Sequence, residues 1–245
     1  MINKKEDFRR IEDFDWRLQA ITTISKESVS PYGTVLKKGE PIVKVHPVKI
    51  NDKSTVIYTP NATAMFLNLS YKFYNQAIKI FNLSTLLQKK SQNEKRCFNS
   101  IEYYMASIIF AYTSLESFTN ECIPDSYIYK KKIKGVLKTF NRDKIQRKIS
   151  LQEKMKFILS KIKKVNFNEE NPLWADYQSL KNIRNRIIHM KTIDILYNRK
   201  DNFYDTIWNE ILNNGKPINY SKVAKEVIKF FLKNKKPRWF LNCIF

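Results

Sequence analysis

Residues 180–191, LKNIRNRIIHMK, contain His189, which is one of only two histidines in the chain. Histidine is the side chain whose ordinary pKa lies nearest to neutral pH, so it can accept and release protons there. Arginine keeps its positive charge and binds anionic oxygens, often through two N–H groups at once. Arg184 and His189 together therefore indicate proton transfer beside a bound anion, and the alternative is a surface histidine without a role.

The helix that would present this segment is predicted over residues 173–190, where apolar side chains recur at helical spacing, and Asn171 before Pro172 is its expected start. At about 100° per residue the apolar stripe comprises Leu173, Leu180, Ile183, Ile187 and Met190. The opposite, polar side comprises Gln178, Asn182, Asn185 and His189, with Arg186 next to them. Arg184 lies about 140° around the helix from His189, so Arg186 is the nearer neighbour and both arginines stay under consideration.

The motif RNRIIH resembles the R-x4–6-H signature of the HEPN superfamily, with four residues between Arg184 and His189 and the polar Asn185 directly after the arginine. Residues 105–123, MASIIFAYTSLESFTNECI, are similar to the upstream bundle helix of many HEPN proteins, which carries an acidic residue and a nearby asparagine. Here these would be Glu116 and Asn120, one helical turn apart. The resemblance covers residues 94–233 and implies a HEPN-like helical bundle.

This resemblance implies a metal-independent endoribonuclease, acting as a toxin or antiviral-defence effector without a cofactor. In such proteins two copies form a homodimer, and the 2′-OH of RNA attacks the adjacent phosphorus in a shared cleft. The product ends are a 2′,3′-cyclic phosphate and a 5′-OH. His189 would move protons, and Arg184 or Arg186 would hold the phosphorane oxygens. Asn185 would orient the imidazole or bind phosphate, and Glu116 would fix the arginine or form a structural pair with it.

Charge is the second strong feature, because 45 Lys and Arg residues face 23 Asp and Glu residues, a formal net charge of +22. Such a field attracts polyanions: nucleic acid first, then an anionic membrane or an acidic protein. We expect RNA, whether tRNA, mRNA or another, as the partner, with an acidic antitoxin or regulatory protein as a further one. The expected RNA-binding residues are Lys191, Lys154, Lys161, Lys163 and Lys164.

Several other classes of site lack their sequence signals. The three cysteines, Cys97, Cys122 and Cys243, are scattered and form no Cys/His cluster, so we expect neither disulfides nor a metal site. There is no Gly-rich phosphate loop, GxSxG, HExxH or kinase signature. No stretch approaches the roughly 18 apolar residues of a membrane span, so we expect a cytoplasmic protein without membrane contact.

The predicted elements divide near residue 60. Residues 1–60 are expected to form an N-terminal helix over 8–24 and a β-hairpin or meander with turns at 37–40 and 51–54. His46, in this strand region, is interpreted as structural or solvent-facing. Residues 61–245 are expected to form a helical domain. A further helix should begin at Ser150, its N-cap, with Glu153 at the third helical position completing the cap. The other helices are expected over 61–88, 94–122, 127–139, 173–190, 203–212 and 221–233. The fold class is therefore mostly α, with a small β-containing N-terminal region.

Two readings without catalysis remain open. In the first, the chain is a non-catalytic helical module that binds nucleic acid or a partner through its basic faces. In the second, it is a subunit of a larger assembly whose acidic partner neutralises the charge. The role of the C-terminal segment KNKKPRWFLNCIF is also open: it packs back on the helical bundle, forms a dimer contact or binds an antitoxin-like partner.

Overall fold

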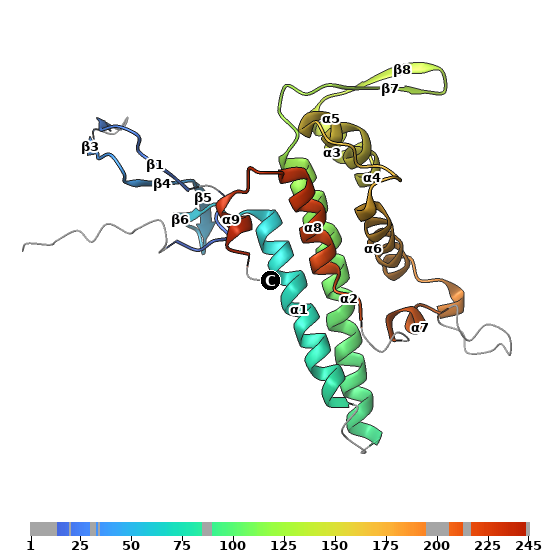
Figure 1. Cartoon of the computed structure of the whole chain (residues 1–245). Coiled ribbons are helices and arrows are strands. Elements are labelled where there is room, and N and C mark those ends of the chain that lie inside the picture. Colours follow the sequence, from blue (N-terminus) through green and yellow to red (C-terminus); the bar gives the residue numbers. More distant parts are fainter. Residues whose placement is uncertain are drawn as a thin grey trace, which may run out of the picture. The chain divides into compact units, whose positions relative to one another are not determined.

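The computed structural model describes residues 14–19, 21–29, 33, 35–84, 90–194, 206–212 and 217–243. The fold is mostly helical with small two-stranded hairpins, as predicted (Figure 1). Contacts group the chain into two compact units, residues 1–65 with 237–244 and residues 66–236. The predicted division assigned 237–244 to the helical part, whereas the observed grouping assigns them to the N-terminal unit.

The first unit is built from short antiparallel strand pairs. Strand β1 (Ile21–Thr23) pairs with β4 (Pro41–Val43), β2 (Ser28–Val29) with β3 (Val35–Leu36), and β5 (Val45–Ile50) with β6 (Lys53–Tyr58). Asn51 and Asp52 join β5 to β6 with positive φ angles, which suits a two-residue type I′ turn. Both predicted turns therefore fall at strand connections, and His46 is exposed on β5.

The predicted helix over 8–24 is wrong where the structure describes it. Residues 21–23 form β1, because the β-branched sequence Ile-Thr-Thr finds hydrogen-bonding partners in β4. Residues 8–13 and 20 lie outside the described residues.

The C-terminal segment also packs within the first unit. Helix α9 (Arg238–Leu241) buries Trp239 and Phe240. The Arg238 guanidinium donates hydrogen bonds to the backbone carbonyls of Phe14 and Asp15. The expected packing on the helical bundle is therefore not the one observed for α9, and the dimer contact and the partner site stay predictions.

Two long helices form the centre of the second unit. Helices α1 (Ala62–Ser84) and α2 (Lys90–Glu121) match the predicted ranges and pack with α8 (Tyr220–Leu232) (Figure 1). Phe73 of α1 stacks on Tyr103 and Phe110 of α2. The buried Ser70 hydroxyl donates to the Ser107 carbonyl, so its polar group is satisfied at the helix contact.

The predicted lysine-rich helix over 127–139 is wrong, because this segment is a β-hairpin. Strand β7 (Tyr129–Ile133) pairs antiparallel with β8 (Val136–Phe140). Lys134 and Gly135 between them both have positive φ, and a type I′ turn requires that combination. A two-residue turn flanked by aromatic and β-branched residues outweighs the moderate helix propensity of lysine.

A short helix and then a longer, composite one follow the hairpin. Helix α3 (Arg142–Lys148) begins at the N-cap Asn141, whose side chain accepts from the Lys144 N–H. Helix α4 (Leu151–Glu153), the π-helical turn η2 (Lys154–Leu159) and α5 (Ser160–Lys163) are consecutive. The Ser150 side chain accepts from the Glu153 N–H at 3.2 Å, so Ser150 is confirmed as the N-cap. The Glu153 carboxylate accepts from Tyr129 and Lys131 instead of completing this cap.

Ser150→Ala is expected to lower the free energy of unfolding by about 1 kcal/mol, because the substitution leaves an N–H at the helix end without its acceptor. The measurement is urea denaturation of the full chain. Ser126→Ala, at an exposed turn, is the matched control and should change stability far less. Equal effects of the two substitutions would show that the cap contributes nothing.

Helix α6 (Pro172–Ile188) carries the RNRIIH segment. It begins at Asn171, the residue expected to start it, whose side chain accepts from the Leu173 N–H. The predicted apolar residues Leu180, Ile183 and Ile187 are buried, and Trp174 and Tyr177 extend this face. Met190 is exposed, contrary to the prediction, because the helix ends at Ile188.

The buried face of α6 packs against α2 and α8. Phe167, just before α6, sits among the rings of Trp174, Tyr177, Phe230 and Phe231. The 3-10 turn η3 (Thr192–Asp194) and α7 (Ile207–Leu212) complete the unit. The motif is thus carried by a helix fixed through its apolar side. Among the described helices, none has the length and apolar character needed to cross a membrane.

Candidate functional site

One side of α2 and the C-terminal half of α6 meet at the candidate site. Tyr112, Glu116 and Asn120 recur at four-residue intervals along α2 and so lie on one face. The Arg184 guanidinium carbon lies 4.8 Å from the centre of the Tyr112 ring, a cation–π contact. Burial raises the pKa of the Tyr112 phenol, and the neighbouring arginine charge only partly offsets this effect, so the phenol stays neutral.

Arg184 is held in place without being neutralised. Its Nη1 donates to the Asn185 side-chain oxygen at 3.0 Å. In the part of the chain that the structure describes, no carboxylate forms an ion pair with it. Arg184 is half-buried, and its positive charge remains available to an anion.

Arg186 is in a different electrostatic position. Its guanidinium lies 3.1 Å from the Asp194 carboxylate and 3.6 Å from that of Glu210. Asp194 is buried and also accepts hydrogen bonds from the N–H groups of Lys191 and Ile207. Two carboxylates therefore compensate the charge of Arg186. Through them Arg186 connects the segment after α6 with α7. Between the two arginines left open by the sequence, this geometry favours Arg184 as the anion-binding one.

Asp194 has an unusually stable ionised form for a buried carboxyl group. Burial by itself raises its pKa. The N–H groups of Ile207 and Lys191 and the Arg186 guanidinium outweigh this effect and hold the pKa below its ordinary value. Asp194 therefore remains charged at neutral pH and acts as an anchor for the segment that follows the motif.

His189 lies at the C-terminal end of α6. Its backbone N–H donates to the Asn185 carbonyl, and its side chain is exposed. Arg184 instead faces α2, and no hydrogen bond joins the two residues in the described structure. The sequence argument that they do not share a helix face is consistent with these positions.

Lys154 is a correction to the expected RNA-binding residues. It is fully buried, and its ammonium donates to the Asn120 side chain at 3.0 Å and to the Gln146 carbonyl at 3.2 Å. Burial lowers the pKa of Lys154, and the Glu116 carboxylate, 3.7 Å away, opposes that effect. A side chain buried this way cannot contact RNA. Its role is to link α2 to the π-helical turn.

This contact also gives Glu116 a different partner from the one expected. The predicted pair between Glu116 and an arginine is not formed among the described residues, where Lys154 is the cation beside it. Because Glu116 remains partly exposed, its carboxylate still borders the surface next to Tyr112.

The remaining predicted RNA-binding lysines are distributed differently. Lys161, Lys164 and Lys191 are exposed. Lys163 is half-buried beside the Cys122 thiol, whose pKa is raised by burial and lowered to a lesser extent by that lysine. The structure thus leaves three of these five side chains fully available to a polyanion.

Sequence reasoning missed two residues that organise the site. Tyr112 lies one turn before Glu116, and that spacing alone would have placed it on the same face. Asp194 follows the motif closely, but a single acid in a loop gives no sign of burial. Its role depends on α7 coming back to contact it.

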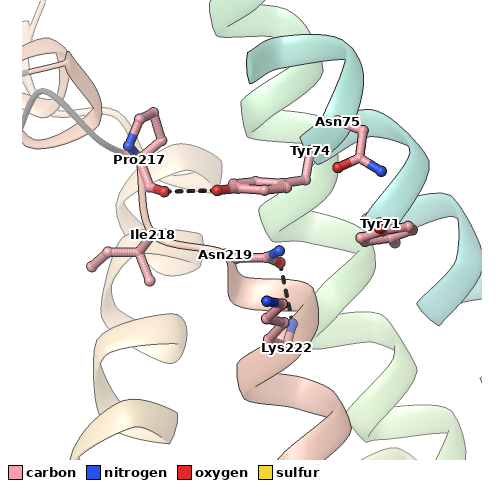
Figure 2. Close-up of a pocket in the computed structure, with 7 residues that line it drawn as sticks. All are labelled: Tyr71, Tyr74, Asn75, Pro217, Ile218, Asn219 and Lys222. Atoms are coloured by element: carbon pink, nitrogen blue, oxygen red, sulfur yellow. Dashed lines mark hydrogen bonds between the residues drawn. The ribbon is translucent and has the colours of Figure 1, made fainter. Parts of the chain in front are cut away.

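A groove of about 440 Å³ lies elsewhere in the second unit (Figure 2). Tyr71, Tyr74 and Asn75 of α1 line one side, and residues 217–219 with Lys222 line the other. The Tyr74 hydroxyl donates to the Pro217 carbonyl, and Asn219 caps α8 through the Lys222 N–H. Neither Arg184 nor His189 lines this groove, so the motif belongs to a separate surface. Among the described residues no group of three potential metal-ligating side chains comes together.

The fold is a mostly helical bundle with appended hairpins, and comparison of the chain with known proteins identifies no relative. No family model matches the chain, and no similar curated protein or solved structure was found. The likeness to the HEPN superfamily therefore rests on the residues of α2 and α6 described above.

Proposed function

We propose that this protein is a metal-independent endoribonuclease of the HEPN type that acts as a toxin or antiviral-defence effector. The observation that carries the proposal is the placement of Arg184 and His189 in the RNRIIH segment. Among the described residues no carboxylate pairs with the Arg184 guanidinium, which Tyr112 and Asn185 support, and His189 follows at the exposed end of the same helix.

In the proposed reaction the 2′-oxygen of RNA bonds to the adjacent phosphorus while the bond from phosphorus to the 5′-oxygen breaks. One imidazole accepts the proton of the 2′-OH, and another protonates the departing 5′-oxygen. The guanidinium of Arg184 stabilises the negative charge that develops on the phosphorane oxygens. Asn185 supports this arginine through its side-chain oxygen.

The need for two imidazoles implies a homodimer. One chain supplies a single motif histidine, and His46 belongs to the other compact unit. His189 is exposed, so a second copy can approach it and complete a composite site. This arrangement also removes the requirement that Arg184 and His189 of one chain touch each other.

The purified protein is expected to cleave tRNA or mRNA in the presence of EDTA. The new ends should be a 2′,3′-cyclic phosphate and a 5′-OH, since these products follow from attack by the 2′-OH. Gel analysis with end-group labelling gives the readout, and sedimentation of the active species gives its oligomeric state. Cleavage only after addition of a divalent metal, or a strictly monomeric active species, contradicts the proposal.

The second candidate function is a non-catalytic module that binds nucleic acid or a partner protein. The formal net charge of +22 and the exposed lysines favour it. In that case RNA would be bound but recovered intact, and substitution of His189 would leave binding unchanged.

A further inference from the structure

The β7–β8 hairpin has one face anchored on the second unit. Its apolar side chains Tyr129, Ile133 and Phe140 pack against a cluster formed by Ile123, Ile145, Ile149 and Ile158. The Tyr129 hydroxyl donates to Glu153 at 3.0 Å, and Lys131 forms an ion pair with the same carboxylate at 2.6 Å. The hairpin is therefore a positioned element at the end of the bundle, next to α3 and α5 (Figure 1).

The outward-facing part of the hairpin is strongly basic. Lys130, Lys132, Lys134 and Lys138 are all exposed, and residues 129–140 contain no acidic side chain. Lys130 and Lys132 alternate along β7, so they point to the same side about 6.6 Å apart. Two lysines lie on the anchored side: Lys131 is neutralised by Glu153, and Lys138, its partner in the strand register, is exposed. The outward face thus presents the ammonium groups of Lys130 and Lys132, and Lys134 adds a third at the turn.

We propose that the β7–β8 hairpin is an arm that binds the phosphates of base-paired RNA without reading its sequence. The choice of RNA rests on the proposed function. Ammonium groups bind phosphates as point charges, and such contacts position a protein on a nucleic acid without specifying bases. The wide, shallow minor groove of an RNA duplex gives a narrow two-stranded arm access to phosphates on both of its edges.

A single-stranded ligand fits this arm less well. Proteins that grip single strands usually stack bases on exposed aromatic side chains. The aromatic residues of the hairpin, Tyr129 and Phe140, turn toward the apolar cluster instead. The exposed face offers charge but no stacking surface, which favours a ligand whose bases are already stacked in a duplex.

An anionic membrane also fits less well, although Val136 and Leu137 are exposed near the tip. In the strand register Val136 lies opposite Ile133 and Leu137 opposite Lys132. Adjacent residues of a strand point to opposite faces, so these two side chains do not form one apolar patch that could enter a bilayer.

The test uses a short RNA duplex with 2′-O-methyl groups, which keeps the A-form but cannot be cut by 2′-OH attack. Fluorescence anisotropy compares the wild type with Lys130→Gln/Lys132→Gln/Lys134→Gln between about 50 and 200 mM salt. The matched control, Lys72→Gln/Lys79→Gln/Lys95→Gln, removes the same charge from exposed positions on α1 and α2.

The hairpin variant is expected to bind at least about tenfold more weakly, and the slope of log K against log salt should fall by about 2 to 3. The control should stay close to wild type, and thermal melting should show that all three proteins are folded. The arm is refuted by any of four results: no duplex binding by the wild type, equal weakening in the control, an equal loss for single-stranded RNA, or a loss confined to anionic vesicles.

Because the probe cannot be cleaved, this result is independent of the nuclease assay. Duplex binding that depends on the hairpin, together with uncut natural RNA, would retain the arm and reject the nuclease. Metal-independent cleavage together with unchanged duplex binding by the hairpin variant would retain the nuclease and reject the arm.

Discussion

His189→Ala is expected to slow RNA cleavage by about 10²–10⁴-fold in EDTA, because the substitution removes the group proposed to transfer protons. His189 is exposed at the end of α6, so the change leaves no buried cavity and the melting temperature should stay close to that of the wild type. Single-turnover cleavage of an end-labelled RNA measures the effect. His46→Ala, at the other exposed histidine, is the matched control and should cleave at the wild-type rate.

Arg184→Ala extends the same prediction to the anion-binding group, with an expected loss of about 10²–10³-fold. Its cation–π contact with Tyr112 contributes only about 0.5–1 kcal/mol to stability, so catalysis should suffer far more than folding. Arg147→Ala, at an exposed arginine on α3, is the control. If Arg184→Ala and His189→Ala both retain full activity, neither residue belongs to the reaction and the HEPN-type mechanism is excluded.

The largest expected loss of stability is that of Asp194→Ala, about 3–5 kcal/mol at neutral pH. The substitution removes the buried carboxylate that accepts from the Arg186 guanidinium and from the N–H groups of Lys191 and Ile207. Urea denaturation of the full chain gives the change in the free energy of unfolding. Asp176→Asn, at an exposed carboxylate of α6, is the control and should change stability little. A loss as small as that of the control would mean that Asp194 does not anchor this segment.

The same carboxylate predicts an acid dependence whose sign can be worked out. The pKa of Asp194 is lower in the folded protein than in the unfolded chain, where it is about 3.9. Its stabilising contribution is therefore complete above about pH 4 and is lost as the pH falls through the lower folded value. Denaturation curves of wild type and Asp194→Ala should converge at that acidic end, and a constant difference down to the lowest pH would contradict the assignment.

The sequence alone determined the main helices and several of their ends. The three- and four-residue spacing of apolar side chains predicted α1, α2, α6 and α8. Ser150 and Asn171 marked helix starts, because capping is a local matter between one side chain and the nearby N–H groups. Apolar spacing and capping depend only on residues close in sequence, so they can be predicted without knowledge of the tertiary structure.

Local information failed at residues 127–139. Lysine is common in helices, and a lysine-rich run with apolar residues between has no decisive period. The hairpin forms because Tyr129, Ile133 and Phe140 find an apolar cluster contributed by α3 and η2 together with Ile123. That cluster exists only after segments distant in sequence have packed, so the propensity of the run could not reveal it.

The electrostatic roles within the candidate site were decided by the tertiary structure. Arg184 and Arg186 are equivalent by composition, yet only Arg186 receives Asp194 and Glu210 as partners. Lys154 has the sequence context of a solvated lysine, yet Asn120 and Gln146 enclose its ammonium. The charge that remains free depends on which distant carboxylates, amides and carbonyls the fold brings near. The sequence supplied the ionisable groups, but packing determined which of them face solvent.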